Sequence, residues 1–210
     1  MLLTYTTDSD TLNLDDIRQA ANLFLQDYSL DTAPQLEIAV HFVSDQKNLS
    51  CVKEGNSCTI TCREPAHFFK AFNMVLHHLE EDFHVEETPN FTKNGFMLDC
   101  SRNAAASVPA VKRLIHMLAR AGMNQLLLYT ADTYEVPGLP YFGAYRGRYT
   151  KEELRELDAY AHNFGIELVP CIQTLAHLRN YLKWPQAEPL KDSADILKLS
   201  LIHISEPTRH

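Results

Sequence analysis

The sequence predicts an α/β protein in which a small α+β domain, residues 1–88, precedes the first three β/α units of a truncated TIM (β/α)8 barrel, residues 94–198. The second part alternates strands with amphipathic helices. Its strands are apolar throughout, which is typical of parallel strands covered by helices. Residues 101–107, which follow the first of these strands, contain no glycine. The phosphate loop of a dinucleotide-binding sheet is therefore missing, which favours a barrel over an open doubly wound sheet.

The composition is that of an ordinary folded protein, with 45% hydrophobic and 22% charged residues in a chain of 210. A net charge of −8 argues against nucleic acid as a partner, because binding phosphates requires a basic surface. No apolar run is long enough to cross a membrane, and the acidic N-terminus is not a secretory signal. Five cysteines without CxxC spacing predict a reduced, cytoplasmic protein that uses no metal or cofactor.

The first domain contains a helix that Asn13 can cap. The apolar face of this helix consists of Ile17, Ala21, Phe24 and Tyr28. Residues 35–43 and 57–62 are predicted strands, since both runs are rich in residues that favour strands. Pro65 suits the first turn of a second helix, whose apolar stripe consists of Phe68, Phe69, Phe72, Leu76 and Leu79. Residues 77–87 lack the HExxH order of a zinc site, so we interpret them as the solvated face of a helix.

Turn-forming residues 87–94 separate the two domains. The predicted barrel strands are residues 95–100, 125–130 and 166–172, and Met97 and Leu98 are expected in packed layers of the barrel. Ser107 caps the helix between the first two strands, and Gly122 ends it. Thr150 and Glu153 form a capping box for the next helix.

Polar side chains follow each of these three strands, and barrel enzymes carry out their chemistry at this end of the strands. They are Asp99 and Arg102, then Asp132 and Glu135, then Gln173 and His177. The planar donors of an arginine suit sugar hydroxyls or a carboxylate, and a His–Asp pair can orient a ring tautomer. The tyrosine-rich loop after the second strand is a candidate wall for a sugar site. On the pattern alone, Arg102 equally fits a surface ion pair, and His177 a structural residue at a helix start.

Four segments resemble the start of glycoside hydrolase family 20, in particular its bacterial β-N-acetylhexosaminidases. They read GFMLDCSRN, NQLLLYTADTYE, YFGAYRGRYT and GIELVPCIQTLAHL. The resemblance extends over residues 94–184, and the preceding domain resembles the small N-terminal domain of that family. Two departures stand out. Many members have two acidic residues where this chain has Ala131 and Asp132, and Pro-Gly-His where it has Leu175, Ala176 and His177.

The resemblance implies removal of terminal β-linked N-acetylhexosamine, either N-acetylglucosamine or N-acetylgalactosamine, with retention of configuration. The acetamido oxygen of the substrate acts as the nucleophile in this family. The resemblance places Arg102 on the sugar hydroxyls, and Asp132 and His177 in a relay to the catalytic acid. An Asp-Glu dipeptide after the fourth strand supplies the main catalytic pair, and the 210 residues contain none. The alternative is a non-catalytic carbohydrate-binding or degenerate barrel protein, in which Arg102 holds a sugar without chemistry.

The final residues suggest an interrupted gene. Residues 199–209 resemble the translation of a sequencing-library adapter, so residues 199–210 are expected to be a non-native tail. Three barrel strands alone would leave an unpaired edge and an apolar face open to water. We expect this chain to be poorly soluble and inactive on aryl β-N-acetylglucosaminides. Genomic DNA that encodes the tail would contradict the adapter interpretation.

Overall fold

The computed structural model describes residues 1–28, 35–102, 104–173 and 178–191, which form two compact units. The first unit comprises residues 1–96, 112–125 and 159–167. The second comprises residues 97–111 and 126–158, together with the described residues from 168 onward. The units interleave in the sequence because two helices contribute their C-terminal portions to the first unit.

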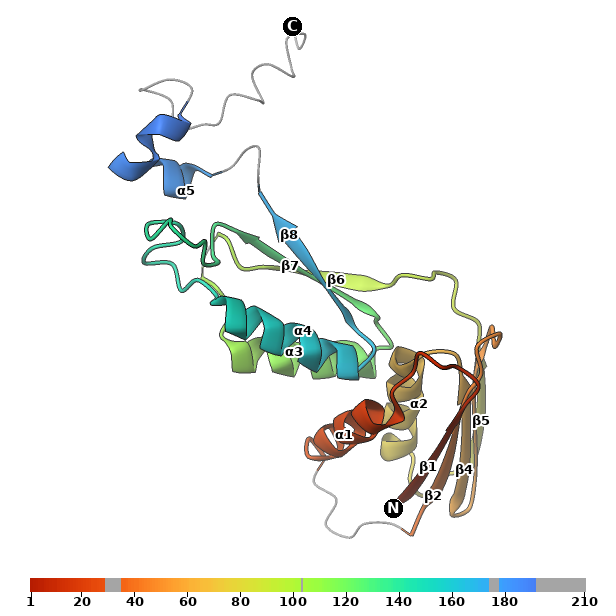
Figure 1. Ribbon diagram of the computed structural model, residues 1–210. Helices are drawn as coiled ribbons and strands as arrows, with labels where there is room; N and C mark the ends of the chain where they lie inside the picture. Colours follow the sequence, from red (N-terminus) through yellow and green to blue (C-terminus); the bar gives the residue numbers. More distant parts are fainter. Residues whose placement is uncertain (29–34, 103, 174–177, 192–210) are drawn as a thin grey trace, which may run out of the picture. The chain divides into compact units, whose positions relative to one another are not determined.

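A five-stranded mixed sheet forms the centre of the first unit, in the order β1-β2-β4-β3-β5 (Figure 1). The strands are β1 (Leu2–Thr7), β2 (Glu37–Phe42), β3 (Leu49–Glu54), β4 (Ser57–Cys62) and β5 (Phe83–Glu87). The pairs β1–β2 and β2–β4 are parallel, and β3 runs antiparallel to both of its neighbours. Helices α1 (Leu14–Leu25) and α2 (Pro65–His77) lie on the same face of this sheet.

Both predicted helices and the two predicted strands of this domain are confirmed, but Tyr28 and Leu79, expected on the helix faces, lie beyond the ends of α1 and α2. The side-chain oxygen of Asn13 accepts a hydrogen bond from the backbone N–H of Asp15, at 3.1 Å, so it caps α1 as expected. The helical interpretation of residues 77–87 was wrong, because α2 ends at His77 and β5 follows it. In β5 every second side chain is partly buried, which is the period of a strand and not of a helix.

Aromatic side chains fill the core of the first unit. Phe24 of α1 and Phe69 of α2 are fully buried, with ring centroids 5.4 Å apart. Phe69 also lies 4.9 Å from the ring of Phe164, which follows helix α4 (Lys151–Asn163). Burying such rings contributes roughly 1.5–3 kcal/mol each. The core of this unit therefore depends on residues that are distant in the sequence.

A polar cluster joins the end of α1 to helix α3 (Val108–Arg120). The carboxylate of Asp27 lies 2.5 Å from Nδ1 of His116 and accepts a hydrogen bond from Arg120 at 2.7 Å. Nε2 of the same histidine lies 2.7 Å from the hydroxyl of Tyr160 in α4. One carboxylate therefore supports two partners on α3, and one of these, His116, is mostly buried.

Replacing Asp27 with alanine is expected to lower the free energy of unfolding by about 1–2 kcal/mol, because it leaves His116 and Arg120 without this partner. Urea unfolding measures the change. Asp15→Ala is the control, since Asp15 pairs with Arg18 on an exposed surface and its loss should cost no more than about 0.5 kcal/mol. Equal losses in the two variants would contradict the structural role of the cluster.

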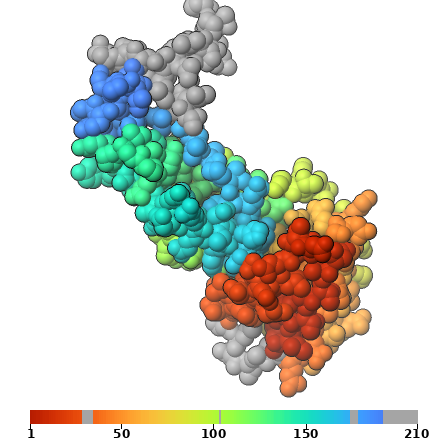
Figure 2. Space-filling view, in the orientation of Figure 1, coloured from red at the N-terminus to blue at the C-terminus, as the bar shows by residue number. Residues whose placement is uncertain are grey.

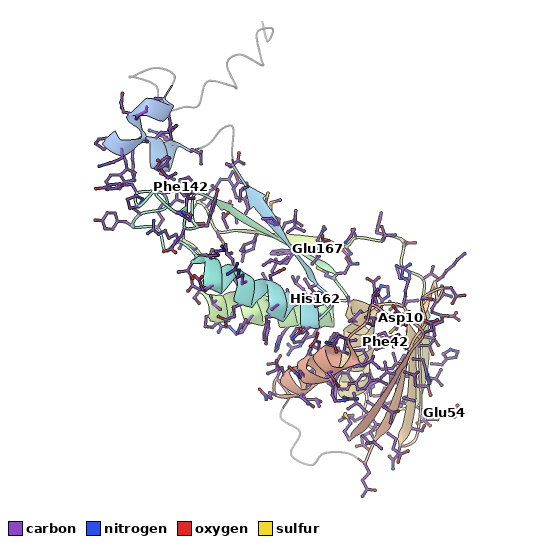
Figure 3. All side chains as sticks on the ribbon, viewed as in Figure 1. Asp10, Phe42, Glu54, Phe142, His162 and Glu167 are labelled. Atoms are coloured by element: carbon purple, nitrogen blue, oxygen red, sulfur yellow. The ribbon has the colours of Figure 1, made fainter. Side chains whose placement is uncertain are left out.

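A second sheet has the order β6-β7-β8. Its strands are β6 (Gly95–Asp99), β7 (Gln125–Ala131) and β8 (Glu167–Ile172), the last beginning at the labelled Glu167 in Figure 3. The N–H of Asn124 donates to the carbonyl of Asn94, and that of Cys100 to the carbonyl of Tyr129. Both partners advance together along the chain, so β6 and β7 are parallel, as predicted.

The predicted helices that follow β6 and β7 are also confirmed. The N–H of Thr150 donates to the Glu153 carboxylate at 2.8 Å, and the Thr150 hydroxyl accepts from the N–H of Glu153 at 3.1 Å. These reciprocal bonds are the predicted capping box of α4. After β8, the described chain forms only the short helix α5 (Arg179–Leu182) and a 3-10 helix, Pro185–Leu190.

Met97 does not lie in a packed layer, contrary to the expectation for it. Its side chain is 51% exposed, that of Ile172 on β8 is 46% exposed, and Leu98 is only partly buried. Within the described ranges, no element covers these side chains fully, so the apolar surface expected to face water does so. No helix among the described residues combines the length and the apolar character needed to cross a membrane.

Candidate functional site

The loop between β7 and α4 is clamped at its base. The backbone N–H of Tyr149 donates to the carbonyl of Thr133, and the N–H of Glu135 donates to the carbonyl of Tyr149. A turn closed by Thr133 and Thr130 contains Ala131, whose φ of +49° is in the left-handed region that alanine rarely adopts. Such strain persists only where the surrounding structure enforces it. The backbone hydrogen bonds around Ala131 therefore hold the neighbouring Asp132 in place.

Asp132 forms a buried ion pair with Arg146 of the same loop. Nη1 of the arginine donates to Oδ1 at 2.7 Å, and the two side chains are 3% and 16% exposed for Asp132 and Arg146. Burial raises the pKa of the Asp132 carboxyl, and the Arg146 guanidinium opposes this effect. The second oxygen, Oδ2, is buried and has no hydrogen-bond partner among the described residues.

Gly143 packs directly against the backbone of Asp132. A Cβ atom added at this glycine would lie 2.3 Å from the Asp132 carbonyl oxygen, and its φ is +67°. Arg148 stabilises the same part of the loop by donating to the carbonyl of Phe142 at 2.6 Å. The loop can therefore bring Arg146 back to Asp132 only because position 143 lacks a side chain.

Arg102 is held at the end of β6 by Asp99. The Asp99 carboxylate accepts hydrogen bonds from the hydroxyl and the backbone N–H of Ser101, and from the Arg102 guanidinium. The hydroxyl of Ser101 is the largest of several causes that lower the pKa of Asp99 to about 2. The guanidinium carbon of Arg102 lies 5.7 Å from the ring centroid of Tyr129, while 75% of the arginine side chain is exposed. Asp99 therefore fixes the orientation of the Arg102 guanidinium, while most of the side chain remains accessible to solvent.

These side chains border a hollow of about 270 Å³ at the carboxyl ends of the strands. Its lining consists of Ser101, Arg102, Tyr129, Ala131, Arg146 and Asn180. Gln173, which follows β8, donates to the hydroxyl of Tyr129 at 2.8 Å. Two guanidinium groups, an amide and hydroxyls offer hydrogen bonds but no strong nucleophile, a set suited to a polyhydroxylated ligand.

The sequence comparison decides the family. The model of "Glycosyl hydrolase family 20, catalytic domain" matches residues 91–201, which is more than half of the chain. The chain belongs to glycosyl hydrolase family 20. A beta-hexosaminidase of Vibrio furnissii is 31% identical over 136 residues, which cover 53% of this chain and 21% of that protein. A probable beta-hexosaminidase of Drosophila melanogaster is 30% identical over 118 residues, or 52% and 18% of the two chains. The chain thus spans about a fifth of the length of these relatives.

Solved structures of family 20 enzymes share the fold. An exo beta-N-acetylglucosaminidase of Vibrio harveyi, in complex with N-acetylglucosamine, matches 93% of this chain and 36% of its own, with a TM-score of 0.73 and 24% identity. A chitobiase of Flavobacterium johnsoniae matches 86% of this chain and 32% of its own, with a TM-score of 0.66 and 21% identity.

The structure places the site residues predicted for this family 20 chain in different surroundings. Arg102 lines the hollow. Asp132 is not part of the lining, but it accepts a hydrogen bond from Arg146, which is. Glu135 lies 3.6 Å from Arg148 and is not part of the hollow's lining. His177 lies outside the described residues, so its predicted partnership with Asp132 stays a prediction. Nowhere in the described ranges do three His, Cys, Asp or Glu side chains gather as metal ligands would.

Sequence reasoning missed Arg146, Tyr129 and Asn180 as residues of the hollow. Arg146 stands beside Gly147, and Gly143 precedes it by three positions in YFGAYRGRYT. An arginine among loop glycines signals a backbone that can turn sharply toward a polar partner. Asn180 is in α5, only four residues long, and had no such signal.

Proposed function

We propose that this chain forms the small N-terminal domain, residues 1–88, and the first three β/α units, residues 94–198, of a β-N-acetylhexosaminidase with a (β/α)8 barrel. The reaction is the removal of terminal β-linked N-acetylhexosamine from saccharides. The observation that carries the proposal is the hollow at the carboxyl ends of parallel strands, lined by Arg102 and Arg146, in a chain of glycosyl hydrolase family 20.

In this proposal the chain supplies the arginine that binds the terminal sugar and two residues of the relay to the catalytic acid. Arg102 donates hydrogen bonds to hydroxyls of the terminal sugar, and its fixed pair with Asp99 keeps the guanidinium aimed. Asp132 and His177 form a relay to the catalytic acid. This role is supported by the buried Oδ2 of Asp132, which has no hydrogen-bond partner in the part of the chain that the structure describes. Arg146 favours the charged form of Asp132. A charged carboxylate can accept a hydrogen bond from an imidazole and so orient its ring.

Catalysis itself requires an Asp-Glu pair that the 210 residues do not contain. In the proposed mechanism, the acetamido oxygen of the substrate attacks its own anomeric carbon. The aspartate orients the acetamide, and the glutamate protonates the departing oxygen. We expect the chain alone to bind N-acetylhexosamine without hydrolysing aryl β-N-acetylglucosaminides. Turnover comparable with that of a full-length relative would refute this.

Arg102→Ala is expected to weaken the binding of N-acetylglucosamine to the 210-residue chain by at least about tenfold, because charge-assisted hydrogen bonds to the sugar are lost. Titration of the soluble fraction of each chain, followed by NMR, measures the affinity. Arg18→Ala is the matched control, since Arg18 forms an ion pair with Asp15 at the same i,i+3 spacing but lies in the first unit. Equal affinity in the Arg102 variant and the unmodified chain would overturn the assignment of the sugar grip.

A further inference from the structure

Two thiols meet in the core of the first unit. Cys51 of β3 and Cys58 of β4 are both buried, and their Sγ atoms lie 3.9 Å apart. Their spacing in the sequence marks no metal motif, and only the antiparallel pairing of the two strands brings them together. Two metal–sulfur bonds of about 2.3 Å place the sulfurs about 3.8 Å apart at a tetrahedral angle, and at most about 4.6 Å apart in line. The observed distance therefore suits two sulfurs that share one ion.

A buried lysine stands beside the two thiols. Lys53 is 1% exposed and lies directly opposite Cys58 in the register of β3 and β4. Its Nζ donates to the carbonyl oxygens of Gly55 and Glu81, at 3.2 and 2.8 Å. No carboxylate in the described part of the chain forms an ion pair with this ammonium. Buried charges are normally paired with an opposite charge, so an anionic partner is expected beside Lys53.

Both cysteines belong to one short hairpin. Strands β3 and β4 are joined by Gly55 and Asn56, directly after Glu54, which Figure 3 labels. Each of the two strands has a neighbour on both sides in the sheet, and Figure 2 shows the red and orange atoms of these strands closely packed. The distance between the sulfurs is set by this local pairing and does not depend on the barrel strands.

A hollow of about 620 Å³ lies at the turn end of the hairpin. Its lining includes Glu54, Ser57 and Glu37, the first residue of β2. The two carboxylates attract cations, and Ser57 directly precedes Cys58. The hollow thus offers an ion an entry path to the buried sulfurs.

The charges of these groups select the kind of ion. Thiolates are soft ligands, which favour Cu(I) and Zn(II) over hard cations. A Cu(I) ion held by two thiolates carries one net negative charge, which the ammonium of Lys53 neutralises. A Zn(II) ion in the same place would form a neutral unit and leave the ammonium unpaired, and structural zinc requires four ligands.

We propose that Cys51 and Cys58 bind one Cu(I) ion, with Lys53 as its counter-charge. This inference is independent of the proposed function, since the hollow lined by Arg102 belongs to the second unit. Binding replaces the two S–H bonds with two Cu–S bonds and releases two protons to solvent. The oxidation state of the copper does not change.

The test adds Cu(I) without oxygen to the soluble fraction of the 210-residue chain, in competition with a chromogenic Cu(I) chelator. We expect one bound ion per chain, with two sulfur ligands in its X-ray absorption spectrum. Cys51→Ala and Cys58→Ala should each lower the affinity by more than about a hundredfold, because each removes one of the two ligands. Cys62→Ala is the matched control, since Cys62 is also buried on β4 and its loss should leave the affinity unchanged.

Lys53→Met tests the choice of ion. Without the ammonium, the Cu(I) unit keeps an unneutralised buried charge, whereas the Zn(II) unit is neutral. The Cu(I) affinity should fall by about tenfold or more, and the Zn(II) affinity should rise. An independent measurement uses the unmodified chain and so does not depend on the folding of any variant. Cu(I) should slow the alkylation of Cys51 and Cys58, detected by mass spectrometry, but not that of Cys62.

Four results would each overturn the site. They are the absence of Cu(I) binding, full affinity in either the Cys51 or the Cys58 variant, Zn(II) binding to the unmodified chain as tightly as Cu(I), and unchanged affinities in Lys53→Met. Loss of binding in Cys62→Ala, or equal protection of all the cysteines from alkylation, would also overturn it, because the copper would then be held elsewhere.

Discussion

Gly143→Ala is expected to lower the free energy of unfolding of the second unit by about 3 kcal/mol. The new methyl group would lie 2.3 Å from the Asp132 carbonyl oxygen, and this oxygen belongs to a clamped backbone that cannot withdraw. Strain of the left-handed backbone adds about 1–2 kcal/mol. Urea unfolding followed by near-UV circular dichroism measures the loss.

Gly147 provides a closely matched control for this prediction. Its φ of +66° is almost the same as the +67° of Gly143, but an added Cβ there would meet only the Cβ of Ala105, at an ordinary 3.9 Å. Gly147→Ala should therefore cost about 1–2 kcal/mol, the strain alone. If the two variants lost equal stability, the close approach of Gly143 to Asp132 would have no energetic importance.

Arg146→Met is expected to destabilise the chain by about 3–5 kcal/mol at pH 7, because it leaves the buried Asp132 carboxylate without its counter-charge. The loss should be smaller at pH 4. Burial raises the pKa of Asp132, so the folded state holds its proton at pH values where the unfolded state has released it. Stability therefore falls as pH rises from the unfolded pKa of about 3.9 through the folded value. Without Arg146, which opposes the rise in the pKa of Asp132, the pH range over which stability falls extends to higher pH.

The double variant Arg146→Met, Asp132→Asn tests the cause. It removes the titrating group, so most of the stability lost at pH 7 should return and the difference between pH 4 and pH 7 should shrink. Urea unfolding of all the variants at both pH values supplies the comparison. A double variant as unstable as Arg146→Met would show that the arginine acts through packing and not through charge.

Local signals in the sequence predicted the helices well. The side chain of Asn13 and the Thr150–Glu153 pair act within a few residues, so their geometry is visible in the spacing alone. Strands β1, β3 and β5 escaped prediction because each alternates between two environments and includes polar residues such as Thr4, Lys53 and Glu86. Their pairing is decided by neighbours far along the chain.

The candidate site also combines features set by local sequence with features set by distant contacts. The position of Arg102 was predictable because it lies three residues after Asp99, the last residue of an apolar strand. The partnership of Arg146 with Asp132 was not, since it depends on a loop closed by Tyr149 and on the close approach of Gly143. Sequence patterns identified the residues at strand ends, whereas contacts made by a folded loop require the structure.

The participation of α3 and α4 in the first unit has a consequence for synthesis on the ribosome. Phe69 emerges early, but Phe164, against which its ring packs, follows 95 residues later. At 5–20 residues per second, this interval lasts roughly 5–20 s. During that time the α1–α2 face presents an uncovered aromatic surface, to which the C-terminal ends of the later helices then dock. The core of the first unit can therefore be completed only after the chain has been synthesised as far as Phe164.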